Sequence, residues 1–236
     1  MIATTIAQNL SRIHERIAAA AAKAGRKPGE ITLVGVSKTH SAQAIREAHT
    51  AGLRHFGENR VQEWEGKHTA LADLSPSCTF HLIGHLQSNK AARAAKYFDR
   101  VDSVDDFSLA QKLDRAAAEK SPTAKLPVLL EVHIGGEETK SGVAEAELIP
   151  LAEQILALPH LSLEGLMCIP PFSENPQEAR PHFAHLRSLQ ENLQSRLQHK
   201  LSVLSMGMSH DFEIAIQEGS TEVRVGTALF GTRPTL

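Results

Sequence analysis

The sequence predicts a single (β/α)8 TIM barrel, in which eight parallel strands close into a ring and helices cover its outside. Short apolar runs of strand type alternate with helical patterns along the chain, and eight such runs occur. Strands that are separated by helices form right-handed crossovers and a parallel sheet. The length of 236 residues is close to the roughly 250 residues that are typical of the closed barrel.

An open, doubly wound sheet is the alternative fold for the same alternation. In a dinucleotide-binding sheet of that kind the first strand leads into a GxGxxG turn, whereas the loop after the first run here reads SKTHS. No stretch rich in proline and glycine divides the chain. We therefore expect one domain over residues 1–236, with an N-terminal helix in 1–25 and the barrel in 31–231.

The N-terminal segment is predicted as an extra helix in front of the barrel. Ile6, Leu10, Ile13 and Ile17 recur at helical spacing, and Gly25 is a typical helix stop. Charged residues interrupt the apolar stretch that a signal peptide would need, so we do not expect one.

The eight predicted strands are short segments rich in aliphatic and β-branched residues. They cover residues 31–37, 53–58, 79–84, 99–104, 126–134, 161–169, 201–206 and 221–226. The segments between them carry helical patterns, and glycine follows several of these at the helix end. The predicted helices cover 41–52, 61–71, 89–98, 106–119, 144–158, 177–199 and 211–218.

The composition argues against several classes of partner. The net charge is −2, from 25 basic and 27 acidic residues that are scattered along the chain. We therefore expect neither nucleic acid nor a membrane as a partner, and no window approaches the roughly 20 apolar residues of a membrane span. Cys78 and Cys168 lack a metal or redox spacing, which predicts reduced thiols in the cytoplasm. The 13 histidines show no HxH or HExxH spacing, and we expect no metal.

Lys38, directly after the first strand, is the candidate reactive group. Alternation within ITLVGVSK places Val34, Val36 and Lys38 on one strand face. If that face points into the barrel, the amine lies at the barrel mouth. A desolvated ammonium loses its proton more readily, and a neutral amine in a pocket forms Schiff bases. The alternative is a lysine that simply extends into water.

Two later segments predict a phosphate site at the same mouth. Ser209 follows the seventh strand in SMGMSHDFEIAI and is a candidate N-cap of the next helix. Gly226 and Thr227 follow the eighth strand, where glycine lets a phosphate approach the backbone and threonine adds a hydroxyl. Barrels commonly bind phosphate with the loops after strands seven and eight. Asp211 and Glu213 oppose an anion there unless they face away.

Other polar residues near the strand ends have two interpretations each. Arg224 shares a strand face with Glu222, so it either serves the site or forms an ion pair with Glu222. His81 and His133 are either hydrogen-bonded core histidines, which we expect, or ligands. Segment 135–142 is either a solvated turn, which we expect, or a flexible phosphate loop or lid. Candidates to line the rim after the second and third strands are Asn59, His85, Gln87 and Asn89.

Seven motifs stand out in combination: VSKTH, GENRVQE, HLIGHLQSNK, KSGV, GLMCIPP, SMGMSHDFEIAI and VRVGTALFG. Together they resemble the pyridoxal phosphate homeostasis proteins, a family of the YggS/PROSC type that binds pyridoxal 5′-phosphate (PLP). The resemblance runs from about Leu33 to Gly231. That family is similar to the barrel domain of alanine racemases without its second domain, which is a fold-type III PLP arrangement.

The resemblance implies a role for each matching residue. Lys38 matches the lysine that forms the internal aldimine with PLP. Arg224 matches the arginine that faces the pyridine nitrogen, and Asn59 matches an asparagine near the cofactor. His133 and Cys168 depart from the family pattern at the rim. The residues that hold the phosphate of the cofactor match Ser209, Gly226 and Thr227.

The resemblance also implies a function without catalysis. The protein is expected to hold PLP and to act in its intracellular homeostasis by buffering or delivery, with effects on amino-acid and keto-acid pools. Apo forms of PLP-dependent enzymes are the implied recipients, and without the second domain that builds the racemase dimer we expect a monomer. The alternative is a small amino-acid racemase that uses Lys38 with a histidine or water as its partner, because the single tyrosine, Tyr97, lies late in the helix after the third strand. A third interpretation is a barrel enzyme that uses Lys38 on a phosphorylated metabolite without PLP.

Overall fold

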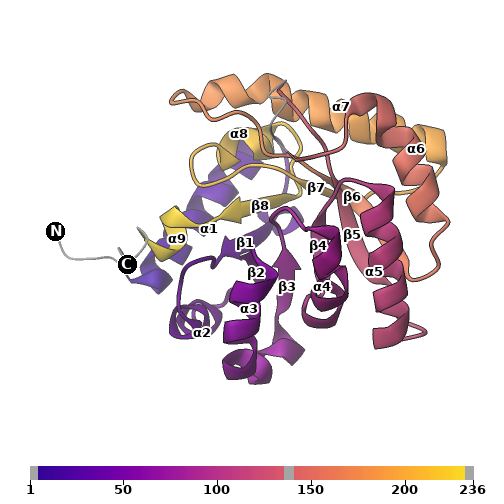
Figure 1. The fold of residues 1–236 in the computed structure, drawn as a ribbon. Helices are drawn as coiled ribbons and strands as arrows, with labels where there is room; N and C mark the ends of the chain where they lie inside the picture. The colour runs from indigo at the N-terminus through magenta and orange to yellow at the C-terminus, as the bar shows by residue number, and fades with distance from the viewer. Residues whose placement is uncertain (1–4, 136–140, 232–236) are drawn as a thin grey trace.

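The computed structural model describes residues 5–135 and 141–231 and confirms the closed parallel barrel (Figure 1). Strands β1 to β8 are Thr32–Val36, His55–Glu58, Thr79–Leu82, Arg100–Val104, Leu126–Glu131, Leu161–Met167, Val203–Ser205 and Glu222–Val225. They follow one another around the ring in chain order, and β8 pairs with β1 to close it. The open-sheet alternative is therefore wrong.

Helices surround the ring, and their apolar sides pack on the outward-facing strand residues. Helices α1 to α9 are Ile6–Lys23, Ala42–Thr50, Val61–His68, Ala91–Tyr97, Phe107–Lys120, Glu145–Leu156, Arg180–Leu197, Phe212–Gln217 and Thr227–Phe230. Within the described ranges, no helix combines the length and the apolar character that crossing a membrane requires.

The extra N-terminal helix is confirmed. Thr5 caps α1 in a reciprocal capping box, and Leu10, Ile13 and Ile17 are buried on its inner side. That side packs against α8, α9 and α2, so α1 covers the outside of the barrel where its first and last strands meet (Figure 1). The Asn9 side chain ties it to α9 through a 2.9 Å hydrogen bond to the carbonyl of Leu229.

The barrel interior is separate from the core under the helices. Val34, Val36, Ile83, Leu129 and Met167 are buried but stand outside the large hydrophobic cluster on the outer side of the sheet. Because successive strand residues point to opposite faces, these side chains fill the lumen. The expectation that Val34 and Val36 point inward is therefore confirmed.

Some predicted boundaries are wrong. The predicted strand 126–134 ends at Glu131, because pairing with β6 stops there and leaves only one isolated bridge at Val132. The predicted helix 61–71 becomes a 3₁₀ segment after His68, and proline interrupts that segment. Helix α9 was not expected at all. Within the predicted turn 135–142, residues 136–140 lie outside the described part of the chain.

Gly165 in β6 provides a test of the barrel packing. A Cβ on Gly165 would overlap the carbonyl oxygen of Val203, its register partner in β7. We expect Gly165→Ala to lower the free energy of unfolding by about 1–3 kcal/mol or more, because backbone cannot yield as a side chain does. Gly29→Ala is the control, since a Cβ there meets nothing within 4 Å. Equal urea unfolding curves for the two variants would contradict the close approach of β6 and β7.

Candidate functional site

The predicted site residues gather at the end of the barrel where the strands finish. β8 pairs with both β7 and β1, and β1 pairs with β2, so the loops after these four strands form one continuous arc of the mouth. Arg224 lies within β8, and its guanidinium donates to the carbonyls of Ser205 and Cys168, at the ends of β7 and β6. The residues that follow the four strands are Lys38, Asn59, Ser209, Gly226 and Thr227.

Barrel closure places the Lys38 turn beside the loop after β8. Val34 is in register with Arg224, and the Cβ of Val36 lies 3.5 Å from the position that a Cβ on Gly226 would take. Lys38 is half-buried two residues further on. The candidate amine and one half of the candidate phosphate site are therefore neighbours across the closing pair of strands.

The two halves of the candidate phosphate site are joined by a hydrogen bond. The backbone N–H of Ala228, in the first turn of α9, donates to the Ser209 hydroxyl at 3.4 Å. The expectation that Ser209 is the N-cap of the next helix is wrong, because Asp211 occupies that position. Ser209 instead reaches across to the loop after β8, where Gly226 is half-buried and Thr227 is exposed.

The two carboxylates near this site are directed into other contacts. Asp211 is buried and accepts a 2.6 Å hydrogen bond from the backbone N–H of Met208. Burial raises the pKa of the Asp211 carboxyl, and the bond from Met208 counteracts that shift. Glu213 forms a 2.6 Å ion pair with Arg16 of α1. Because both carboxylates are bound elsewhere, they repel an anion at this site less than the sequence suggests.

Arg224 is buried at the bottom of the candidate site. Its guanidinium donates to the backbone carbonyl and hydroxyl of Ser205 at 2.8 and 2.7 Å, and to the carbonyl of Cys168 at 2.8 Å. The alternative that Arg224 pairs with Glu222 is wrong, since Glu222 binds Arg100 instead. The Ser205 hydroxyl donates to Glu222 at 2.8 Å, so it links the two residues.

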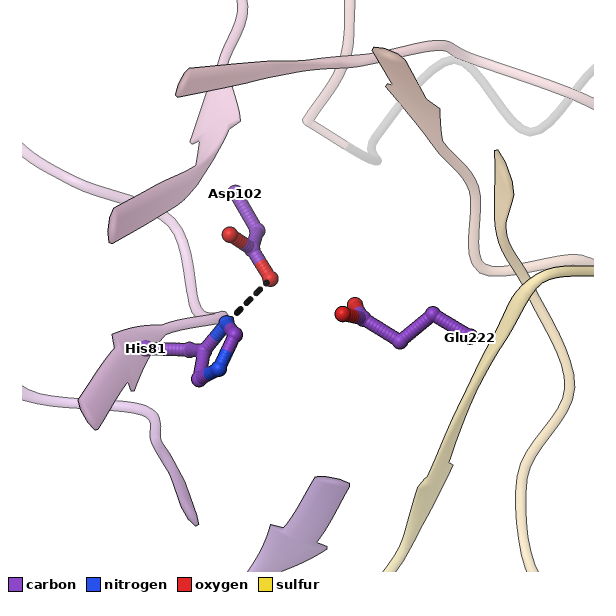
Figure 2. A group of neighbouring side chains, drawn as sticks. All are labelled: His81, Asp102 and Glu222. Carbon is purple, nitrogen blue, oxygen red and sulfur yellow. Dashed lines mark ion pairs between the residues drawn. The ribbon is translucent and has the colours of Figure 1, made fainter. Parts of the chain in front are cut away.

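A buried charge network lies beneath Arg224 in the lumen. Figure 2 shows three of its members, His81, Asp102 and Glu222, pointing toward one another from β3, β4 and β8. Arg100 binds two of them, with 2.6 and 2.9 Å bonds to Asp102 and two 2.6 Å bonds to Glu222. His81 lies 3.5 Å from Asp102 and shares a 3.1 Å hydrogen bond with His55.

His81, Asp102 and Glu222 are also a combination of residues that can bind a metal ion. Their ligand atoms lie within 4.8 Å of one another. Arg100, however, already supplies the positive charge that the two carboxylates require. Burial acts to raise the pKa of Asp102, but the Arg100 guanidinium overcomes it and holds that pKa well below its usual range. The cluster is therefore an ion network that needs no metal.

The turn that carries Lys38 is held on both sides by a second ion network. The Lys67 ammonium donates to the Ser37 carbonyl at 3.0 Å, to Glu58 at 2.9 Å and to Glu63 at 2.7 Å. The Ser37 hydroxyl donates to Glu58 at 2.7 Å, and the Thr39 N–H donates to Glu63. The peptide groups before and after Lys38 are thus bound by α3 and β2.

Two features show that this support is needed. Thr39 has a φ of 66°, in the left-handed region that a β-branched residue rarely adopts. Glu58 is fully buried, and burial raises the pKa of its carboxyl although Lys67 and Ser37 counteract that shift. The bonds from Lys67 and Glu63 therefore stabilise a strained turn and an otherwise costly buried acid.

The mouth on the side of β4 and β5 is acidic. Glu131 is buried, accepts a 3.0 Å hydrogen bond from Ser141, and has its pKa raised by burial. Its second carboxyl oxygen and Nε2 of His133 are buried without hydrogen-bond partners among the described residues. The expectation of a fully hydrogen-bonded His133 is therefore wrong, and His133 lies beyond the end of its strand.

Sequence reasoning missed both ion networks. Their signal was present, because Arg100, Asp102 and Glu222 are charged residues at inward positions of strands, where apolar residues are usual. Glu63 and Lys67 are also spaced for an ion pair along one helix side. The pattern did not indicate which strand residues face one another across the lumen.

Comparison with known families gives one match over nearly the whole chain. The profile described as "Alanine racemase, N-terminal domain" matches residues 8–234. A relative from Aquifex aeolicus, described as pyridoxal phosphate homeostasis protein, is 46% identical over 226 residues, which cover 96% of this chain and 97% of that protein. A relative from Pseudomonas aeruginosa with the same description is 47% identical over 232 residues, covering 98% and 96%.

A solved structure is similar over the same extent. It is PipY of Synechococcus elongatus with PLP bound, which is 41% identical and superposes with a TM-score of 0.84. The superposition covers 96% of this chain and 100% of the PipY chain. The described barrel therefore matches a relative along its full length.

Lys67→Met tests the support of the Lys38 turn. The variant leaves Glu58 buried without a cation, and we expect a loss of about 3–5 kcal/mol in the free energy of unfolding near neutral pH. Removing Lys67 raises the pKa of Glu58 further above its value in the unfolded chain. A group with a raised folded pKa loses its stabilising contribution as the pH rises, so the loss is larger at pH 8 than at pH 5.

Lys125→Met is the matched control, because Lys125 is exposed on the surface. Denaturant unfolding of both variants at the two pH values measures the difference. A loss in Lys67→Met that is small, or that does not change with pH, would show that Glu58 does not depend on Lys67.

Proposed function

The chain belongs to the pyridoxal phosphate homeostasis protein family, and on that basis we propose that it binds PLP at the barrel mouth and acts in the homeostasis of that cofactor. The observation that carries the proposal is the convergence of three groups on one arc of the mouth. They are an amine, a set of hydroxyl and glycine residues suited to phosphate, and a buried guanidinium.

The residues present fit the parts of the cofactor. The hydroxyls of Ser209 and Thr227 lie at the start of α9, next to a glycine that leaves room for a phosphate. The PipY structure has PLP bound and is 41% identical to this chain, which supports the proposed fit. We propose that Ser209, Gly226 and Thr227 hold the phosphate and that Asn59 lies beside the ring.

Lys38 is proposed as the point of covalent attachment. Its amine would add to the aldehyde carbon of PLP, and loss of one water would give the internal aldimine. The ion network that binds the peptide groups of Ser37 and Thr39 fixes the turn, so the amine starts from a defined place. Such positioning lowers the cost of forming the bond.

Arg224 is proposed to face the pyridine nitrogen. Arginine stays protonated, so a ring nitrogen beside it stays unprotonated and the ring is a weaker electron sink. Ser205 and the Cys168 carbonyl hold the guanidinium in place. This arrangement favours holding the cofactor over transamination.

We propose that the protein is a holder of PLP and not a racemase. A racemase needs acid–base groups on both faces of the substrate α-carbon, and Lys38 serves only one face. Tyr97 is at the end of α4, where its ring contacts His68 at 5.1 Å and Lys96 at 4.9 Å. Its phenol is therefore committed to the outer helices and not to the mouth.

The remaining expectations stay proposals. We propose one domain over 1–236, a monomer, and buffering or delivery of PLP to apo enzymes with effects on amino-acid and keto-acid pools. Cys78 and Cys168 are free and buried, and burial raises the pKa of the Cys168 thiol to about 12. Two unreactive thiols support the proposed cytoplasmic location.

Lys38→Ala tests the attachment. We expect purified wild-type protein with added PLP to show an absorption band that borohydride reduces, with the label mapped to the peptide containing Lys38. The band is absent in Lys38→Ala and unchanged in Lys125→Ala, which removes an exposed lysine. A reducible chromophore at full occupancy in Lys38→Ala would overturn the assignment.

Exchange of the α-hydrogen of alanine with deuterated solvent separates holder from racemase. We expect the PLP-loaded protein to exchange it no faster than an equal concentration of free PLP, because Tyr97 lies at the end of α4 and an arginine at the pyridine nitrogen leaves the ring a weak electron sink. NMR of the alanine signal measures the rate. Exchange with turnover that disappears in Lys38→Ala would establish the racemase instead.

A further inference from the structure

A pocket opens next to the proposed cofactor site, between the carboxyl ends of β2 and β3. Its volume is about 430 Å³. Asn59 belongs to its wall, so it adjoins the proposed site. Its walls come from the loops and first helical turns after these strands, through Asn59, Arg60, Val61, Gln62, Leu82, His85, Leu86, Gln87 and Lys90.

We propose that this pocket binds a small anion, carried by either a carboxylate or a phosphate group. Arg60 and Lys90 are the permanently charged residues among those that line it, and none of the lining residues is Asp or Glu. The amides of Asn59, Gln62 and Gln87 add hydrogen-bond donors. A pocket with two cations, three amides and no carboxylate favours a negative ligand.

The two cations are available for such a ligand. Within residues 5–135 and 141–231, neither the Arg60 guanidinium nor the Lys90 ammonium has a hydrogen bond or an ion pair. Neighbouring cations are occupied, since Lys67 binds Glu58 and Arg93 binds Glu65. The charge of Arg60 acts on the Glu63 carboxylate from a distance, but the ion pair of Glu63 is with Lys67 and not with Arg60.

The start of α3 adds to the same potential. Arg60 occupies its N-cap position, and no side chain caps the helix there. The first N–H groups of a helix have no partner within it and carry partial positive charge. Val61 and Gln62 belong to this turn and line the pocket. The backbone and the two cations therefore act on the same space.

His85 does not reverse this charge. It is exposed and lies 3.6 Å from Asp105, which stands on the neighbouring β4 loop outside the pocket lining. Asp105 also accepts a hydrogen bond from the N–H of Gly142 at 3.3 Å, and burial raises the pKa of its carboxyl. Asp105 thus contacts Gly142 and His85, and within the described residues it forms no ion pair with Arg60 or Lys90.

The anion proposal does not rest on the PLP proposal. The two sites share Asn59, but Arg60, Lys90 and the start of α3 belong to the anion pocket alone, so the anion proposal stands whether or not PLP binds. Where both hold, the anion lies beside the cofactor along the Asn59 wall. The protein would then bind the cofactor and a small carboxylate or phosphate ligand side by side.

The test is a titration of the full chain followed by amide NMR at constant ionic strength. The probes are inorganic phosphate and, separately, acetate, each with and without saturating PLP. We expect saturable shifts at Val61, Gln62 and Gln87 for at least one probe. A phosphate-only response identifies a phosphorylated ligand, and a response to both probes identifies a carboxylate-tolerant site.

Arg60→Gln and Lys90→Gln are expected to weaken this binding about fivefold or more, because each removes one positive charge from the pocket that holds the anion. Lys96→Gln removes the same charge from α4 outside the pocket and should leave the affinity unchanged. Shifts that do not saturate, or that weaken equally in all three variants, overturn the proposal. The amide signals of Ser209 and Ala228 report binding at the proposed cofactor phosphate site. Failure of the PLP proposal therefore gives a different result from failure of the anion proposal.

Discussion

Closure of the barrel between β8 and β1 is the constraint on which the rest of the structure depends. The register pairs Val34 with Arg224 and Gly35 with Val225. It brings the loop after the first strand against the loop after the last, although they lie at opposite ends of the chain. Helix α1 secures this seam from outside by packing on α8 and α9. The amine and the candidate phosphate site become neighbours only because the ring closes.

A closed ring of eight strands also forces every second residue into a narrow lumen. In this chain several of those residues are charged, and burying them is expensive unless each is paired. Arg100 meets this requirement by binding both Asp102 and Glu222, the two carboxylates that Figure 2 shows beside His81. Ser205 then connects Glu222 to Arg224, so the charge that faces the mouth is supported from below.

The two sides of the candidate site are therefore held by the same physical device, a buried carboxylate bound to a cation and to a serine. Glu58 with Lys67 and Ser37 supports the Lys38 turn, and Glu222 with Arg100 and Ser205 supports Arg224. Each carboxylate holds one functional group in place, which explains why a barrel would retain costly buried ions.

The sequence by itself determined the alternation of strands and helices, the inward face of β1, and the strand ends at which Lys38, Ser209 and Gly226 stand. These features follow from local periodicity and glycine placement, which neighbouring residues decide. Only the tertiary structure decided that Ser209 bonds Ala228 instead of capping α8, that Arg100 rather than Arg224 binds Glu222, and that Arg60 and Lys90 share a pocket. Those contacts depend on strand register and barrel closure, which join residues far apart in the chain and leave no local pattern to read.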